Sequence, residues 1–148
     1  MTMKTSTGLR DSMLDTESFR TTFQDGKLMI FSTPVPADAD AAETGTLLVT
    51  IWENNMGSPN GLDWEAVSVA GVLSKLASQV WSQAVGTTGV AANYRFVKQA
   101  DGGGISTTEE RVQGDIALVG SDLNLSNLTL TSPTVLVIDS FSILLPTL

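Results

Sequence analysis

The residues of this chain that could do chemistry are mainly carboxylates, because its 148 residues include no histidine and no cysteine. Histidine is the commonest catalytic base and metal ligand, and cysteine supplies every thiol, so nucleophilic triads of the serine or cysteine type are excluded. A Ser–Lys dyad is formally available at Ser74 and Lys75. Neighbouring residues of a strand point to opposite faces, however, so this pair is poorly placed for proton transfer.

One pair of carboxylates, Asp63 and Glu65, flanks Trp64 and is the remaining catalytic candidate. Glycoside hydrolysis needs two acids that face each other across the scissile bond, and an aromatic platform beside them suits a sugar. Strand alternation favours another interpretation, in which Trp64 lies in the core and both acids lie in solvent. We therefore predict no catalytic residue and no cofactor. The other tryptophans, Trp52 and Trp81, are also predicted to be core residues.

Acidic residues are concentrated between positions 38 and 65, where six acids occur without a lysine or arginine. Asp38, Asp40 and Glu43 resemble part of a calcium loop, but a further ligand and the turn glycine of an EF-hand are missing, so no metal site is predicted. The region is either a solubilising edge or an acidic surface that docks on a basic partner. The net charge of −8 argues against nucleic acid and anionic membranes as the main partners.

Residues 1–25 are predicted to form a helical segment distinct from the β-domain of residues 26–148. The first of two short helices carries Leu9, Met13 and Leu14 and begins at Ser6 or Thr7, and the second carries Phe19 and Phe23 and begins at Asp15 or Thr16. Such helices cannot form a core alone, so their apolar faces cover either the β-domain, which we favour, or a neighbouring subunit. Removing residues 1–25 is expected to leave a folded β-domain.

From position 27 the hydrophobic period changes to two, which is typical of strands. Eight strands are predicted, at Lys27–Ser32, Thr46–Trp52, Val67–Leu73, Ser78–Val85, Val90–Lys98, Val112–Val119, Leu128–Thr131 and Val135–Leu145. The turn at residues 86–89 is expected to join two of them as a hairpin. The predicted fold class is mainly β, an antiparallel β-sandwich of jelly-roll or Greek-key type with two short N-terminal helices.

One charged residue interrupts the pattern of the last predicted strand. Asp139 falls in phase with the apolar Val137 and Phe141. A bulge, or a partner such as Arg95 or Arg111, would resolve this conflict.

The order of short motifs along nearly the whole chain resembles a family of small virion proteins of tailed bacteriophages. The motifs are 6–10 (STGLR), 13–15 (MLD), 37–42 (ADADAA), 45–50 (GTLLVT), 60–62 (NGL), 70–75 (AGVLSK), 80–82 (VWS), 114–115 (GD), 121–126 (SDLNLS), 138–142 (IDSFS) and 145–146 (LP). The resemblance implies a structural role without catalysis. It favours a capsid decoration or cement protein that binds and stabilises the shell of the major capsid protein.

The alternatives are a head–tail connector or tail component, and a glycan-binding jelly-roll module displayed on the virion. The decoration interpretation implies synthesis in the bacterial cytoplasm, a final location on the capsid exterior, and a homo-oligomer, either a trimer or a dimer. The candidate docking surface consists of Leu9, Met13, Phe19 and Phe23 from the helices and Asp38, Asp40 and Glu43 from the acidic region.

Overall fold

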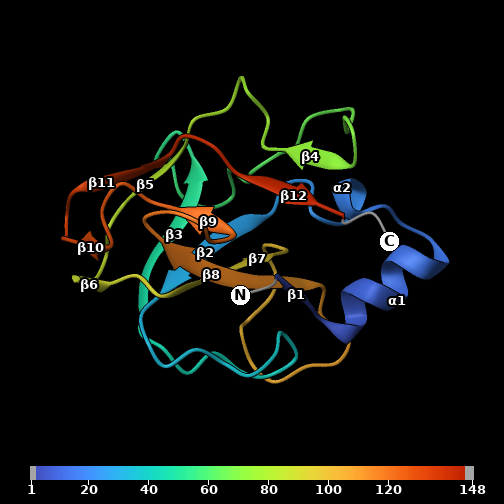
Figure 1. The fold of residues 1–148 in the computed structure, drawn as a ribbon, viewed down its shortest axis with the longest axis horizontal. Helices are drawn as coiled ribbons and strands as arrows, with labels where there is room; N and C mark the ends of the chain where they lie inside the picture. The colour runs from blue at the N-terminus through green and yellow to red at the C-terminus, as the bar shows by residue number, and fades with distance from the viewer. Residues whose placement is uncertain (1–2, 146–148) are drawn as a thin grey trace.

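Alternating apolar residues in the middle of the chain build one wide sheet, which is the main layer of the fold (Figure 1). In the computed structural model, which describes residues 3–145, the strands follow the order β1-β8-β7-β2-β3-β5-β11, with β9 beside β8. Two small sheets, β10-β6 and β12-β4, complete the strands of this part of the chain. All pairs are antiparallel except β8 and β9. The predicted mainly β, antiparallel fold with two short helices is confirmed, and it is consistent with a sandwich; jelly-roll connectivity stays a prediction.

The strands are short, as their bounds show. They are β1 Lys4–Thr5, β2 Lys27–Phe31, β3 Leu47–Glu53, β4 Val72–Ser74, β5 Trp81–Ala84, β6 Gly89–Val90, β7 Asn93–Val97, β8 Arg111–Ala117, β9 Leu123–Asn124, β10 Thr129–Leu130, β11 Val135–Ile138 and β12 Ser142–Leu144. The predicted hairpin across residues 86–89 is wrong, because β5 pairs with β3 and β11 whereas β7 pairs with β2 and β8. Local turn residues are compatible with many pairings, and the choice among them is made by distant strands.

The last predicted strand is broken into two. β11 ends at Ile138 and β12 begins at Ser142, with Asp139 exposed in the break. Neither arginine is its partner, since Arg95 and Arg111 pair with other acids. The conflict at Asp139 is therefore resolved by ending the strand.

The two helices are α1, Thr7–Asp15, and α2, Phe19–Thr22. Ser6 caps α1, as predicted, by accepting a hydrogen bond from the Leu9 N–H. The predicted start of the second helix is wrong, because Ser18 caps α2 in a reciprocal box with Thr21. Among the described residues no helix is long and apolar enough to cross a membrane.

Aromatic rings form the centre of the core. Trp64 makes a T-shaped contact with Trp81, with ring centroids 5.5 Å apart, and also packs on Phe96 and Phe141. Trp64 and Trp81 are buried, which confirms two of the three tryptophan predictions. Trp52 is only half-buried, so its assignment to the core is wrong.

Candidate functional site

The predicted docking residues of the helices face inward. Leu9 and Phe23 are fully buried, and Phe19 is almost so, in the same core as the main sheet. Met13 is partly buried against that core. The boundary at residue 25 therefore does not separate two cores, and Leu9, Phe19 and Phe23 are covered by this chain rather than offered to a partner. The favoured interpretation, that the helices cover the β-domain, is the one the structure shows.

The acidic residues 38–43 tie the helices to the sheet. Asp40 accepts hydrogen bonds from the backbone N–H and the hydroxyl of Thr7, at 2.8 and 2.6 Å. The hydroxyl bond is the main cause that lowers the pKa of Asp40. A carboxylate is favourable here because it lies at the positive end of α1. Asp38 closes its own turn by accepting from the N–H groups of Asp40 and Ala41.

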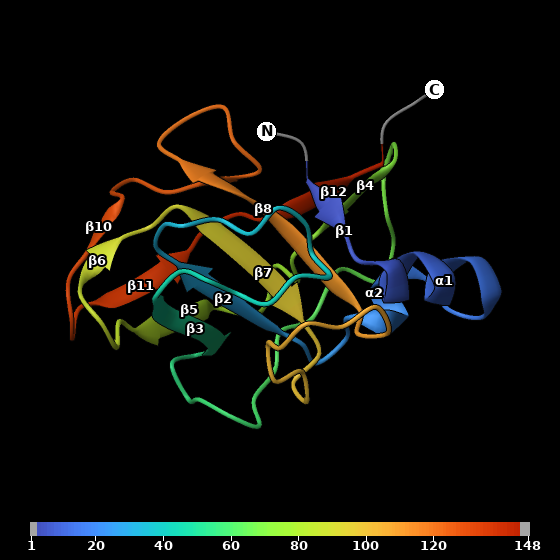
Figure 2. The same ribbon diagram turned by 90° about the horizontal axis from the view of Figure 1, so that it is seen from below.

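Glu43 forms a buried ion pair with Arg95, whose Nε lies 2.7 Å from the carboxylate. Burial raises the pKa of Glu43 and lowers that of Arg95, and the attraction between the two groups offsets only part of this effect. Arg95 also donates to the Gln113 side chain and to the Asp38 carbonyl. These contacts join β7 and β8 to the connection that covers them, which Figure 2 shows crossing the sheet.

A second buried pair lies beside the first. Arg111 donates through two nitrogens to the Asp101 carboxylate, at 2.6 and 2.8 Å, and both side chains are 1% exposed. Burial opposes ionisation of Asp101, but the bonds from Arg111 and from the Gly103 N–H outweigh it and lower the pKa. The sequence analysis missed this polar layer, although Arg95, Arg111 and Gln113 alternate with apolar residues in β7 and β8. Alternation marks a polar face but does not show that a loop covers it.

The carboxylates beside Trp64 are also used internally. Asp63 accepts from the Asp25 N–H at 2.9 Å, and Glu65 accepts from the Ala77 N–H at 2.8 Å. Lys75, the other catalytic candidate, donates to the Gln79 carbonyl and lies over the Trp81 ring. Burial lowers the pKa of Lys75. These contacts hold both carboxylates and the Lys75 ammonium in hydrogen bonds within the chain.

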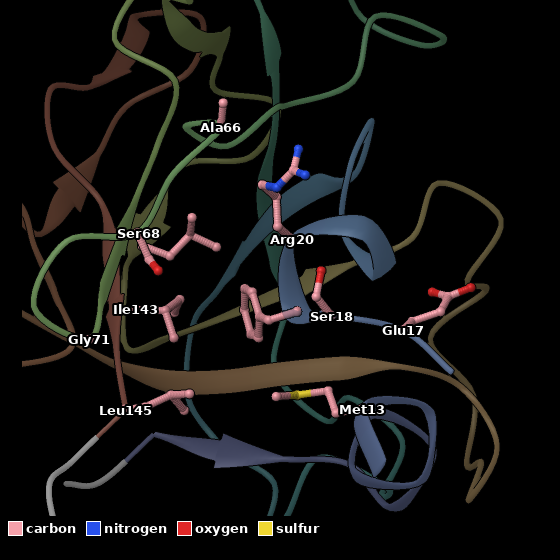
Figure 3. Close-up of a pocket in the computed structure, with 11 residues that line it drawn as sticks. Met13, Glu17, Ser18, Arg20, Ala66, Ser68, Gly71, Ile143 and Leu145 are labelled. Atoms are coloured by element: carbon pink, nitrogen blue, oxygen red, sulfur yellow. The ribbon is translucent and has the colours of Figure 1, made fainter. Parts of the chain in front are cut away.

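A hollow of about 510 Å³ lies between the helices and the C-terminal strand, and Figure 3 shows the residues around it. Met13 from α1, Ile143 from β12 and Leu145 line its apolar side. Glu17 and Arg20 bring charge to it from the helical segment. Of the predicted docking residues of the helices, Met13 and the largely buried Phe19 border this hollow.

An uncharged hairpin stands beside this hollow. Residues 69–72 form its turn, in which Ala70 and Gly71 both have positive φ, the pattern of a two-residue hairpin turn. One face of the hairpin and β12 carries an apolar set, which we call the hairpin patch: the exposed Val67, Val69 and Leu144 and the half-buried Val72. Val69 and Leu144 both lie opposite Val72 in the ladder, so these side chains share a face. Val67 and Val69 are 73% and 72% exposed. The prediction of a continuous strand Val67–Leu73 is wrong, since the turn interrupts it.

No protein-family model, curated protein or solved structure matches this chain.

The described residues include neither a metal-ligating cluster nor a fully exposed tryptophan or tyrosine. Within residues 3–145 no group of three or more metal-ligating side chains lies together. A sugar groove needs exposed rings, whereas Trp64, Trp81 and Tyr94 are buried and Trp52 is half-buried. The hairpin patch is an apolar, uncharged surface of the kind that marks protein interfaces.

Proposed function

We propose that this chain is a non-enzymatic structural protein of a tailed-bacteriophage virion, and that it decorates the capsid by binding the major capsid protein. The resemblance of the motif order to such proteins supports this proposal. The observation that carries it is the hairpin patch, whose four apolar side chains belong to a projecting hairpin and its partner strand. Bound copies stabilise an assembled shell through mass action, because they bind the assembled state in preference to free subunits.

The hairpin patch suits an apolar site with charges of both signs at its rim. Residues 66–74 contain no charge, so the hairpin can enter an apolar groove without burying an unpaired ion. Glu65 precedes the hairpin and Lys75 follows it, and Glu17 and Arg20 both lie at the adjoining hollow. A partner with an apolar groove and residues of both charges around it is therefore complementary to this surface.

The first test is the copy number of the protein in purified virions, measured by mass spectrometry against the major capsid protein. Hundreds of copies, in a simple ratio to the capsid protein, are expected of a decoration protein. A few copies would move the protein to a connector or the tail, and its absence from virions would refute the virion role.

The second test uses the Val69→Asp variant in a binding assay with isolated shells. A buried, unpaired carboxylate at the centre of an interface is expected to weaken binding at least about tenfold. Ile105→Asp is the matched control, because Ile105 is 83% exposed on a different loop. Equal binding by both folded variants would show that the hairpin patch is not the docking surface.

A further inference from the structure

We infer that two copies of this chain pair symmetrically through the free edge of β11, so that the main sheet continues from one copy into the other. This inference concerns the free protein and does not rest on the proposed role in a virion. It follows from the backbone of β11, from the charge distribution around it and from the residues on its exposed face.

β11 is the last strand of the main sheet and has a neighbour on one side only. The Val85 N–H donates to the Thr134 carbonyl. Because bonded and non-bonded pairs alternate in an antiparallel ladder, Leu136 and Ile138 also bond to β5. The N–H and C=O groups of Val135 and Val137 therefore point outward. Two hydrogen bonds of Asn55 agree with this alternation. Asn55 bonds to the Ala84 N–H and the Ser82 C=O, which are groups of β5 that point away from β11. The outward groups of β11 form an open template for another strand.

The edge of β11 lacks the usual protection against pairing. Edge strands are commonly kept apart by charge, particularly lysine, or by being very short. The opposite edge of the sheet is β1, which has two residues and includes Lys4. β11 has four residues, and the chain carries no charge from 123 to 138. The two edges therefore differ in the feature that normally prevents association.

The same end of the molecule is free of charged residues over a wider area. Residues 44–52, 76–94 and 123–138 contain no charged side chain. They include most of β3 and all of β5, β6, β10 and β11, which Figures 1 and 2 both place at the end opposite the helices. Interface cores are depleted of charge in this way. All eight units of net negative charge belong to the remainder of the chain.

The exposed face beside this edge has an aromatic anchor. Trp52, Ser82 and Val137 lie directly opposite one another on β3, β5 and β11, so they share a face of the sheet. Val135 and Val137 are 48% and 45% exposed on it. Lys27 lies next to Trp52 in the register, but its ammonium bonds to carbonyl oxygens of the 99–101 loop, away from β11.

A second copy of this chain fits the surface better than a charged partner does. Two molecules that each carry a net charge of −8 repel when their acidic regions meet. Approach through the charge-free end places those regions far apart and needs no desolvation of an ion. The strand is also self-complementary: antiparallel pairing about Leu136 sets Val135 of one copy opposite Val137 of the other, and uses the outward N–H and C=O groups of both.

Amide hydrogen exchange at several protein concentrations tests this pairing directly. The amides of Val135 and Val137 are expected to exchange rapidly in dilute protein and slowly in concentrated protein. The amides of Leu136 and Ile138, which bond within the subunit, are expected to be protected at both concentrations. Rapid exchange of Val135 and Val137 at every concentration would overturn the inference.

Sedimentation velocity on variants supplies the second measurement. Val137→Lys is expected to raise the dimer dissociation constant at least about thirtyfold, because it brings two ammonium groups to the shared edge. Val69→Lys, which places the same charge on the hairpin patch, where Val69 is 72% exposed against 45% for Val137, is the control and is expected to dimerise like the native protein.

A third variant guards against a folding defect. Val137→Pro removes an N–H that points outward, so it removes no hydrogen bond within the main sheet. It is expected to be folded and monomeric. A native protein that sediments only as a monomer, or a folded Val137→Lys variant that still dimerises like the native protein, would refute pairing through β11.

Discussion

Replacing Phe23 with alanine tests whether the helical segment is part of the core. The Phe23 side chain is fully buried at the C-terminal end of α2. Its ring lies 4.8 Å from that of Phe19 and 5.5 Å from that of Phe96, which belongs to β7. The variant would therefore leave a cavity at the point where the helix meets the main sheet.

The expected cost of Phe23→Ala follows from burial and ring contacts. Phenylalanine-to-alanine changes in cores destabilise by about 3–5 kcal/mol, and complete burial with two aromatic partners places Phe23 in the upper half of that range. Domains of this size are stable by roughly 5–15 kcal/mol, so the loss is a large fraction of the total. The melting temperature is expected to fall by roughly 8–20 °C.

The assay is urea unfolding followed by tryptophan fluorescence, with calorimetry for the melting temperature. Leu14→Ala is the matched control, because Leu14 belongs to the neighbouring helix but is 85% exposed; its effect is expected within about 0.5 kcal/mol. A Phe23→Ala variant as stable as Leu14→Ala would refute the placement of the helices in the core. By the same reasoning, deleting residues 1–25 is expected to unfold the chain.

Three further changes have expected signs that depend on the tertiary structure. Asp101→Asn leaves Arg111 buried without its counter-ion and is expected to destabilise by about 3–5 kcal/mol. Because the pKa of Asp101 is lowered in the folded protein, its full contribution to stability is present above its unfolded pKa, which is near 4. That contribution is lost as the pH falls through the folded pKa. The free energies of unfolding of the native protein and the variant should therefore converge in acid. Gly8→Ala raises helix propensity by about 1 kcal/mol, yet it is expected to destabilise because the new methyl group would overlap the Thr108 carbonyl; a higher melting temperature would contradict the packing of α1. Ala70→Gly is expected to stabilise by about 1 kcal/mol, since Ala70 has a φ of +51° in the hairpin turn. A loss of stability in thermal unfolding would argue against that turn.

The helical segment shows which structural features local sequence patterns can predict. The serine before the first helix identifies its cap, and the four-residue spacing of Phe19 and Phe23 identifies one face. Neither pattern shows what that face covers. The burial of Leu9 in the same core as the main sheet is seen only in the folded structure.

In the acidic region, too, the local sequence does not show which side chains are covered by the fold. A run of acids without a nearby base in sequence favours a solvated or docking surface. Glu43 instead meets Arg95, which lies more than fifty residues away, so the run covers a polar face of the sheet. The exposure of Trp52 is equally non-local, because it depends on which strands border β3.

The sequence by itself determined the mainly β character, the Ser6 cap and the exclusion of histidine- and cysteine-based chemistry, because composition and side-chain period act within one segment. It also contained the charge-free stretches. Only the tertiary structure decided that these stretches meet at one end, that β11 is an edge and that Arg95 and Arg111 are buried. Strand order is set by contacts between segments far apart in the chain, and these leave no periodic signal in any one of them.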